Sequence, residues 1–196
     1  LGYRDKRVDQ AVIDCIQNVG SMVGFSLDIE SEVCELIKEM CPNIEKLRFA
    51  NSGTEAVLGA IRTARGATKR EKVIVIEGGF HGLFDEMMWK SDVENWNRSA
   101  DEAPPIIPFG GGLTATSRAL VELIPLNAYN ELEEKLKDQS IAAVIIEPIM
   151  GNCGSIMATT EYMKSLRELC TSTGTALIID EVKTGFRVAK GGVQEL

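Results

Sequence analysis

The alternation of short apolar runs with helical segments constrains the fold of this chain more than any other feature. Four runs have the length of buried strands, and a fifth, weaker run contains Pro125, which favours a sheet edge or a strand end. The four runs are residues 46–51, 72–77, 141–147 and 175–180, and the weaker one is 119–126. Helical spacing of apolar residues is found between several of them, at residues 53–65, 129–138 and 161–173. This order predicts an α/β fold, a mostly parallel sheet with helices on both faces.

Two further helices are expected before the first of these runs. Apolar residues recur at helical spacing over residues 8–19 and end at Gly20, a suitable C-terminal cap. A second periodic segment, residues 29–40, ends before Pro42. We therefore divide the chain into N-terminal helices, residues 1–44, and an α/β domain, residues 45–196. Residues 91–117 are rich in proline and glycine and predict one long loop of the kind that often covers or binds a ligand.

The composition of the chain limits the kinds of partner and ligand that it can bind. The net charge of -8 argues against nucleic-acid and anionic-membrane surfaces, which would repel the chain. No stretch approaches the roughly 20 apolar residues of a membrane span. Five scattered cysteines without a C-x-x-C pair favour reduced thiols, and hence a cytoplasmic protein. With His81 as the only histidine, a multi-histidine metal site cannot form, so we expect no metal of that kind.

Ligands of open parallel sheets bind beyond the carboxyl ends of the strands, so the residues after each run are candidate site residues. The first group is Asn51-Ser52-Gly53-Thr54-Glu55, where a helix begins directly after a run. Free N–H groups and the positive end of the helix dipole would attract a phosphate there, and Gly53 would allow close approach. The alternative is a plain N-cap made by Ser52 or Thr54.

The second group is Gly78-Gly79-Phe80-His81-Gly82, which follows the next run. Phe80 could cover the face of a planar ring, and His81 could hydrogen-bond beside it. The alternative is a loop aromatic that plugs the sheet edge, next to a solvated histidine.

Two more strand ends carry acids. Pro148 breaks the chain after one run and places Glu147 and Asn152 at the carboxyl edge, unless these side chains are simply solvated. Asp180 closes the last run, where a buried carboxylate is costly unless it is paired. A protonated pyridine nitrogen would pair it, as in enzymes that use pyridoxal 5'-phosphate (PLP). The alternatives are a turn cap or a divalent-metal site built from Asp180 and Glu181.

Taken together, the four groups supply a phosphate cup, a stacking aromatic, polar groups for a ring substituent and an acid for a ring nitrogen. That set suits a phosphorylated pyridine. A nucleotide-binding domain is disfavoured because the chain has no G-x-G-x-x-G turn and no P-loop lysine.

At these residues the chain resembles the class III aminotransferases, and most closely the glutamate-1-semialdehyde 2,1-aminomutase group. The resemblance covers nearly the whole chain and rests on N-S-G-T-E-A at 51–56, F-H-G at 80–82, I-I-E-P at 145–148 and I-I-D-E-V-K-T-G-F-R at 178–187. It implies a PLP-dependent transferase or isomerase of fold type I, with residues 45–196 as part of the large cofactor-binding domain. It also implies a homodimer with the active site at the interface, and small amino or keto substrates.

The resemblance assigns a position around the cofactor to most of the candidate residues. Ser52, Gly53 and Thr54 would hold the phosphate, with Phe80 on one face of the ring and Val182 on the other. Asp180 would bind the pyridine nitrogen, and Asn152 would lie near the phenolic oxygen. Gly151-Asn152 favours the aminomutase branch, whereas residues 91–117 do not match the gating loop expected of it. Lys183 stands where Met or Gln is more usual.

The Schiff-base lysine of this family lies beyond the D-E-V-x-T-G-F-R segment. Lys183 is too close to Asp180 to reach the cofactor aldehyde, and Lys190 is interpreted as a surface charge. We therefore expect the chain to be a piece of a longer polypeptide that transfers an amino group, inactive on its own. The alternative is a non-catalytic PLP-binding or structural module.

Overall fold

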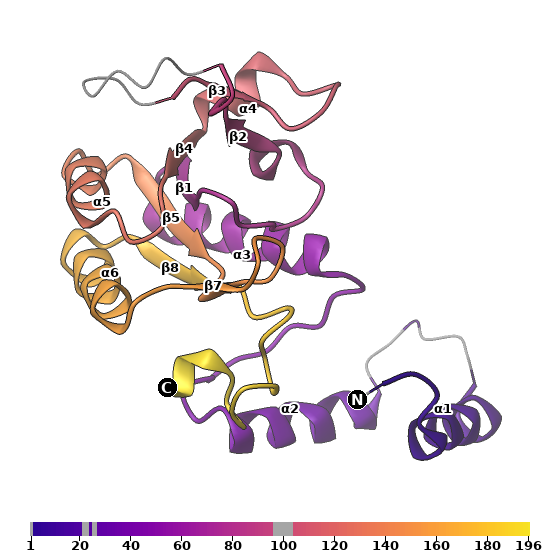
Figure 1. Cartoon of the computed structure of the whole chain (residues 1–196). Helices are drawn as coiled ribbons and strands as arrows, with labels where there is room; N and C mark the ends of the chain where they lie inside the picture. Colours follow the sequence, from indigo (N-terminus) through magenta and orange to yellow (C-terminus); the bar gives the residue numbers. More distant parts are fainter. Residues whose placement is uncertain (1, 21–23, 25–26, 96–103) are drawn as a thin grey trace. The chain divides into compact units, whose positions relative to one another are not determined.

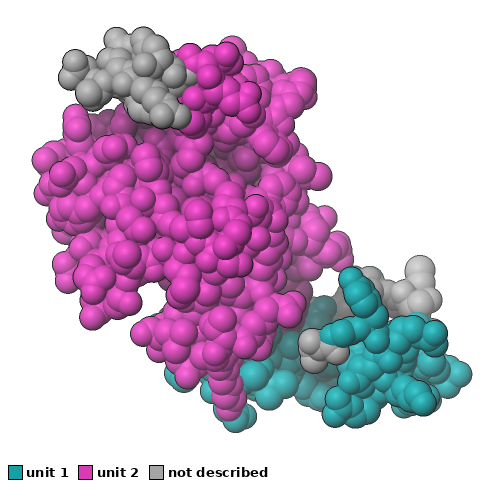
Figure 2. Space-filling view, viewed as in Figure 1, with its two compact units in different colours: residues 1–47 teal, residues 48–196 magenta. Residues whose placement is uncertain are grey.

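The computed structural model describes residues 2–20, 24, 27–95 and 104–196 of the 196-residue chain. The chain divides into two compact units, Leu1–Leu47 and Arg48–Leu196, coloured separately in Figure 2. Within the described ranges, no helix is both long enough and apolar enough to cross a membrane.

Two amphipathic helices make up most of the first unit: α1 spans Lys6–Asn18 and α2 spans Asp28–Met40. Asp5 caps α1 by accepting a hydrogen bond from the Arg7 N–H at 2.9 Å. Neither helix has a buried residue, and their apolar side chains are largely exposed. The exposed apolar residues include Val8, Val12, Ile13, Ile16, Ile29 and Leu36. Both predicted helices are therefore present, with their apolar stripes uncovered.

A four-stranded parallel sheet in the order β4-β1-β5-β8 forms the centre of the second unit. Strands β1 (Lys72–Ile76), β5 (Ile141–Ile146) and β8 (Ala176–Ile179) form within the apolar runs, as predicted. The predicted edge strand is confirmed as β4 (Val121–Ile124), which ends just before Pro125. Because every pair is parallel, the carboxyl ends of all four strands meet at one edge of the sheet.

Helices cover both faces of this sheet (Figure 1). They are α3 (Gly53–Thr68), α5 (Tyr129–Leu136) and α6 (Thr160–Thr173). Successive residues of β1 point to opposite faces. Ile74 and Ile76 belong to the core cluster with α5 and α6, whereas Val73 and Val75 belong to the cluster with α3. This arrangement confirms the predicted fold class.

The strand predicted at residues 46–51 is wrong. These residues pair with no strand in the described part of the chain, although Leu47 and Phe49 alternate with polar residues. A strand needs a neighbour that satisfies its backbone hydrogen bonds, and apolar alternation does not reveal whether one is present. Phe49 is 45% exposed, as expected of a segment that no sheet holds.

The single long loop predicted at residues 91–117 is also only partly correct. Strand β2 (Trp89–Ser91) pairs antiparallel with β3 (Ile106–Pro108), and the short helix α4 (Ala115–Ala119) follows. Part of the predicted loop, residues 96–103, lies outside the described residues. The proline and glycine content concealed a hairpin because Pro108 stands at the end of β3, where it pairs with Trp89.

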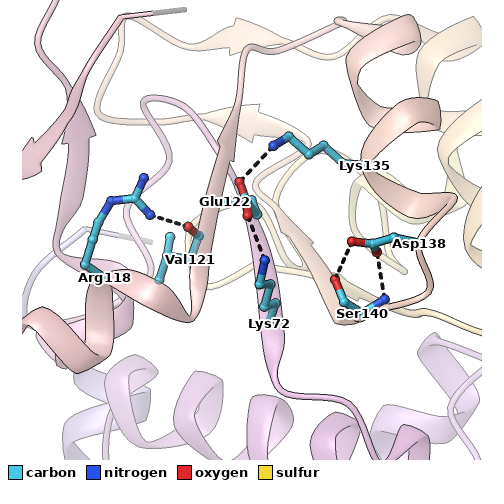
Figure 3. Close-up of polar contacts among 7 residues, drawn as sticks. All are labelled: Lys72, Arg118, Val121, Glu122, Lys135, Asp138 and Ser140. Carbon is cyan, nitrogen blue, oxygen red and sulfur yellow. Dashed lines mark hydrogen bonds and ion pairs between the residues drawn. The ribbon is translucent and has the colours of Figure 1, made fainter.

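Polar side chains at the amino edge of the sheet pair with one another (Figure 3). Glu122 of β4 accepts hydrogen bonds from Lys72 at 3.2 Å and from Lys135 at 3.0 Å. Arg70 donates to the carbonyl oxygens of Ile141 and Thr173 at 3.2 and 2.8 Å. These contacts join the starts of β1, β4 and β5 to the helices around them.

Strand β8 lies at the other side of the sheet from β4. Among the described strands it pairs only with β5, through the register Ala143↔Ala176 to Ile146↔Ile179. All four of its residues are half-buried, in contrast to β5, where all six are buried. The outer edge of β8 is therefore a row of backbone groups without a strand partner in the described chain.

Candidate cofactor site at the carboxyl edge of the sheet

Helix α3 begins at the carboxyl edge with Ser52 as its N-cap. The Ser52 hydroxyl accepts a hydrogen bond from the Glu55 N–H at 3.2 Å, and the Glu55 carboxylate accepts one from the Asn51 N–H at 2.8 Å. The capping interpretation therefore holds for Ser52. In the described part of the chain, the N–H groups of Gly53 and Thr54 have no acceptor. Those N–H groups and the positive end of the helix dipole remain able to bind an anion.

Two glycines let other segments approach this helix start. A Cβ on Gly53 would stand 3.2 Å from Cγ2 of Val182, so the Val182 side chain lies against the first residue of α3. Gly82 has a φ of +108°, and a Cβ there would stand 2.8 Å from the Cα of Thr54. No other residue fits that position without displacing backbone. The glycines thus place the 80–82 loop and the segment after β8 against the predicted phosphate cup.

His81 and Asp180 form a buried pair at the same edge. The Nδ1 atom of His81 lies 2.8 Å from Oδ2 of Asp180, and the two side chains are 0% and 4% exposed. An ionised carboxylate only accepts hydrogen bonds, so His81 carries its proton on Nδ1. Its Nε2 atom is buried with no hydrogen-bond partner, and a Cβ on Gly79 would stand 2.6 Å from it. An unprotonated Nε2 needs no acceptor, so the geometry fits a neutral imidazole that orients Asp180.

The second oxygen of Asp180 is also held. Oδ1 accepts a hydrogen bond from the Val182 N–H at 3.0 Å. Neither donor is a lysine or an arginine, and no lysine or arginine pairs with Asp180 among the described residues. A buried carboxylate without a cationic partner is costly unless a ligand supplies the positive charge. Asp180 is therefore an oriented carboxyl group with which a cationic ligand could pair.

Glu147 ties two site loops together. It is 4% exposed, and its carboxylate accepts hydrogen bonds from the Phe80 N–H at 2.7 Å and the Gly151 N–H at 3.3 Å. The solvated alternative for Glu147 is therefore wrong. The backbone of Phe80 is thus anchored by Glu147, while the residue is 42% exposed, so its ring is accessible to a ligand.

Asn152 stands in the turn of a small hairpin, between β6 (Ile149–Met150) and β7 (Ile156–Met157). Its side-chain oxygen accepts a hydrogen bond from Lys183, the residue next to Val182, at 2.5 Å. Asn152 thus meets the segment that follows β8. Its predicted proximity to a phenolic oxygen stays a prediction.

The metal-site alternative for Asp180 and Glu181 is not supported. The Glu181 carboxylate accepts hydrogen bonds from the hydroxyl of Thr184 and from backbone N–H groups near the 3₁₀ helix at Val193–Glu195. Asp180 is engaged by His81 and Val182. In the ranges that the structure describes, no three His, Cys, Asp or Glu side chains come together to hold a metal ion.

The candidate residues therefore fall into contacting groups at one edge. Direct contacts join Gly53 to Val182, Thr54 to the 80–82 loop, and His81 to Asp180. Sequence reasoning placed Glu147 at this edge but did not foresee that it anchors the Phe80 loop. A glutamate between a buried strand and a proline was the available signal, since a carboxylate held at a strand end needs donors nearby.

The fold and the site together define an α/β protein that gathers polar groups at the carboxyl ends of parallel strands. The sequence profile of the family Aminotransferase class-III matches residues 1–193, and the chain belongs to this family. Curated relatives include glutamate-1-semialdehyde 2,1-aminomutases of Chlorobium limicola and Chlorobium phaeobacteroides, 41% and 38% identical over the whole of this chain. The chain spans 44% of the length of each of these relatives.

Solved structures agree with this assignment. An omega-transaminase from Sphaerobacter thermophilus matches 99% of this chain with a TM-score of 0.88 and 29% identity, over 44% of its own chain. A structure described as a transaminase with PLP bound matches 99% of this chain with a TM-score of 0.85 and the same identity, again over 44% of its chain. A glutamate-1-semialdehyde aminomutase from Pseudomonas aeruginosa shares the fold, with a TM-score of 0.87 and 24% identity, over 99% of this chain and 41% of its own.

Proposed function

We propose that this chain is the cofactor-binding core of an enzyme that uses pyridoxal 5'-phosphate to transfer an amino group. The full enzyme would act on small amino or keto substrates, by aminotransfer between two molecules or by aminomutase chemistry within one. The relatives named as glutamate-1-semialdehyde aminomutases favour the second reaction.

The observation that carries the proposal is the buried and oriented carboxyl group of Asp180, with which no lysine or arginine pairs among the described residues. A protonated ring nitrogen would supply the missing positive charge, and the pairing would keep that nitrogen protonated. The imidazole of His81 would hold the carboxylate in place through its Nδ1–H. The neutral Val182 N–H fixes the other oxygen, so the carboxylate does not have to reorganise when the ring binds.

The remaining residues fit the other parts of the cofactor. The phosphate would lie at the start of α3, where the Gly53 and Thr54 N–H groups have no acceptor among the described residues and the hydroxyls of Ser52 and Thr54 belong to the same turn. The exposed side chains of Phe80 and Val182, at 42% and 65%, would cover the two faces of the ring. Asn152 would lie near the ring oxygen.

When bound, the cofactor supplies the electron sink that makes amino transfer possible. The described residues would bind its phosphate, cover its ring and hold the proton at its ring nitrogen. A lysine outside residues 1–196 would hold the cofactor aldehyde and move the proton at the reacting carbon. This division of labour predicts that residues 1–196 alone do not turn over substrate.

We further propose a cytoplasmic homodimer. The exposed apolar residues of α1 and α2 support an association that buries them, because contiguous exposed apolar surface favours a partner. The cysteines, all free, suit a reducing compartment.

The test uses the protein expressed from the complete coding sequence, mixed with PLP. We expect a visible absorption band that borohydride abolishes, and amino transfer from glutamate 1-semialdehyde or from an amine to a keto acid. Absence of the band would reject the proposal. A band that dilution removes and borohydride leaves intact would favour a non-catalytic PLP-binding module in its place.

A further inference from the structure

Glu181 directly follows Asp180, and its carboxylate accepts hydrogen bonds at both oxygens. Oε2 accepts from the Thr184 hydroxyl at 2.9 Å and from the Val193 N–H at 2.7 Å. Oε1 accepts from the backbone N–H and the side-chain NH₂ group of Gln194, at 3.2 and 3.1 Å. A backbone N–H group can only donate, so each oxygen of Glu181 has to act as an acceptor. A carboxylate can do this, whereas a glutamine amide accepts at only one atom.

Two glycines allow the chain to close around this carboxylate. Gly192 has a φ of +82°, which favours glycine, and a Cβ there would stand 2.6 Å from Oε1 of Glu181. The Gly185 N–H donates to the carbonyl oxygen of Glu181 at 2.8 Å, and a Cβ on Gly185 would stand 2.9 Å from that oxygen. Glu181 therefore joins the turn that follows β8 to residues 191–195 through both its backbone and its side chain.

The anchored residue stands between two residues of the candidate site. Asp180 continues the pairing of β8 with β5, because its N–H donates to the Ile146 carbonyl oxygen at 2.8 Å. Val182 lies beyond the end of the strand, and its side chain contacts the start of α3 at Gly53. Because Val182 is 65% exposed, burial contributes little to holding it there. The position of Val182 therefore depends on the residue that precedes it.

We propose that Glu181 is a positioning residue that acts on the candidate site through Val182. Its carboxylate holds residues 191–195 against the chain after β8 and thereby keeps the Val182 side chain against Gly53. This deepens the proposed function and rests on it for the ligand, which is the cofactor ring that Val182 would cover. Glu181 itself does not contact the ring, since the chain occupies both of its oxygens.

The first experiment measures the position of Val182 without the cofactor. The full-length protein is labelled with ¹³C at the valine methyl groups, and the Val182 signals are assigned as those that Val182→Ile removes. Glu181→Gln keeps the size of the side chain but leaves the N–H of Val193 or Gln194 without an acceptor. It should shift the Val182 signals and accelerate the amide exchange of Val193 or Gln194 about tenfold.

A second variant breaks the same contact from the opposite side. Gly192→Ala leaves residue 181 unchanged, but its Cβ would displace the Glu181 carboxylate. It should shift the Val182 signals in the same direction as Glu181→Gln. The double variant should shift them little further, because both changes remove one interaction. Fully additive shifts would show that the two variants act separately, and would overturn the proposal.

The third experiment tests the consequence for cofactor binding. Glu181→Gln should raise the apparent Kd for PLP about fivefold, the loss expected when one aliphatic side chain no longer covers the ring. The circular dichroism of the visible band should decrease, because one face of the ring is held less firmly. The pH dependence of the band should stay the same, since Asp180 still pairs with the ring nitrogen.

Glu168→Gln is the matched control. Glu168 is an exposed residue of α6, and its replacement changes the net charge equally. It should leave the methyl signals, the amide exchange and the Kd unchanged. The proposal is overturned if Glu181→Gln leaves the Val182 signals and the Kd for PLP unaltered, even where the exchange of Val193 or Gln194 accelerates. If the unaltered protein gives no visible band with PLP, the proposed function fails, and the Val182 signals alone decide about Glu181.

Discussion

The two edges of the central sheet differ in how their polar groups are paired. At the amino edge, Glu122 pairs with Lys72 and Lys135 (Figure 3). Arg70 donates to backbone and hydroxyl oxygens there. At the carboxyl edge, no lysine or arginine pairs with Asp180, and the first N–H groups of α3 lack acceptors, in the part of the chain that the structure describes. The amino edge uses its charges to hold the fold together. The carboxyl edge keeps capacity for a ligand.

The largest expected effect is at the carboxyl edge. Asp180→Asn in the full-length protein should lower turnover by at least about 100-fold, because the ring nitrogen loses its counter-charge. The free energy of unfolding should fall by only about 1 kcal/mol, since Asn still accepts from His81. Steady-state kinetics and urea unfolding measure the two effects. Asp138→Asn is the control. In the described chain the Asp138 carboxylate accepts hydrogen bonds only from Ser140, so this variant should keep full activity. Near-normal turnover of Asp180→Asn would show that the carboxyl edge does not depend on this charge.

The amino edge should respond in the opposite way. Arg70→Met removes a charged donor from Ile141, Thr173 and Thr175, so the free energy of unfolding should fall by about 2 kcal/mol. Turnover per folded molecule should not change. Arg62 is an exposed arginine of α3, the helix that precedes Arg70. Comparing the urea unfolding of Arg70→Met and Arg62→Met separates the effect of the lost hydrogen bonds from the effect of the lost charge. Equal stability of the two variants would contradict the prediction.

Tyr162 of α6 tests whether a buried polar group without a partner must be functional. Among the described residues its hydroxyl has no hydrogen-bond partner, and neither has Nε2 of His81 at the site. Burial, with smaller contributions from Cys170 and Glu131, raises the pKa of Tyr162 to about 12. Tyr162→Phe should raise the free energy of unfolding by about 1 kcal/mol at neutral pH and leave turnover unchanged.

The alkaline behaviour of Tyr162 provides an independent check. The pKa of Tyr162 in the folded protein lies above the ordinary value of 10.0, so the folded state holds the hydroxyl proton more tightly than the unfolded state does. The stability that is linked to this proton is fully present below pH 10 and is lost as the pH rises towards about 12. Tyr162→Phe should remove that part of the loss of stability at alkaline pH. Identical unfolding profiles for the two proteins between pH 9 and 11 would show that the hydroxyl is solvated.

The smallest effect concerns Glu122. Burial opposes its ionisation, but hydrogen bonds and charges of Lys135 and Lys72 outweigh burial and hold the pKa below its ordinary 4.5. A lowered folded pKa contributes stability that is present above pH 4.5 and lost as the pH falls through the folded value. Glu122→Gln should remove about 0.5 kcal/mol of acid-sensitive stability, a small value because the group is partly solvated. Thermal unfolding between pH 3 and 6 measures it, with Glu133→Gln as the control for an exposed pair.

Apolar runs predicted β1, β5 and β8 well, since a strand buried on both faces must be apolar throughout. The same signal failed at residues 46–51, because pairing depends on a neighbour that the run itself does not specify. The strand ends correctly placed Asp180 and Phe80 at the carboxyl edge, whereas the start of α3 was located by its N-cap residue Ser52 and not by a strand. The contact between His81 and Asp180 joins residues 99 positions apart, and no local pattern encodes which loop reaches which acid.

Glycines explain part of what the sequence could not reveal. Gly82 and Gly151 were visible as loop residues, but their importance lies in the atoms that occupy the space of the missing side chains. Only the folded chain places Thr54 beside Gly82 and Lys183 over Gly151. The contacts that assemble the site are therefore tertiary, even though every residue in them stands in a recognisable motif.

The outer edge of β8 has a practical consequence for anyone who produces residues 1–196 alone. The outer edge of β8, which has no strand partner in the described part of the chain, offers its backbone to any extended segment, including one from another copy. Its residues, Ala176 to Ile179, are apolar and carry no charge that would deter such pairing. The isolated segment should self-associate as its concentration increases, and a charged residue on β8 or a strand supplied in trans should keep it dispersed.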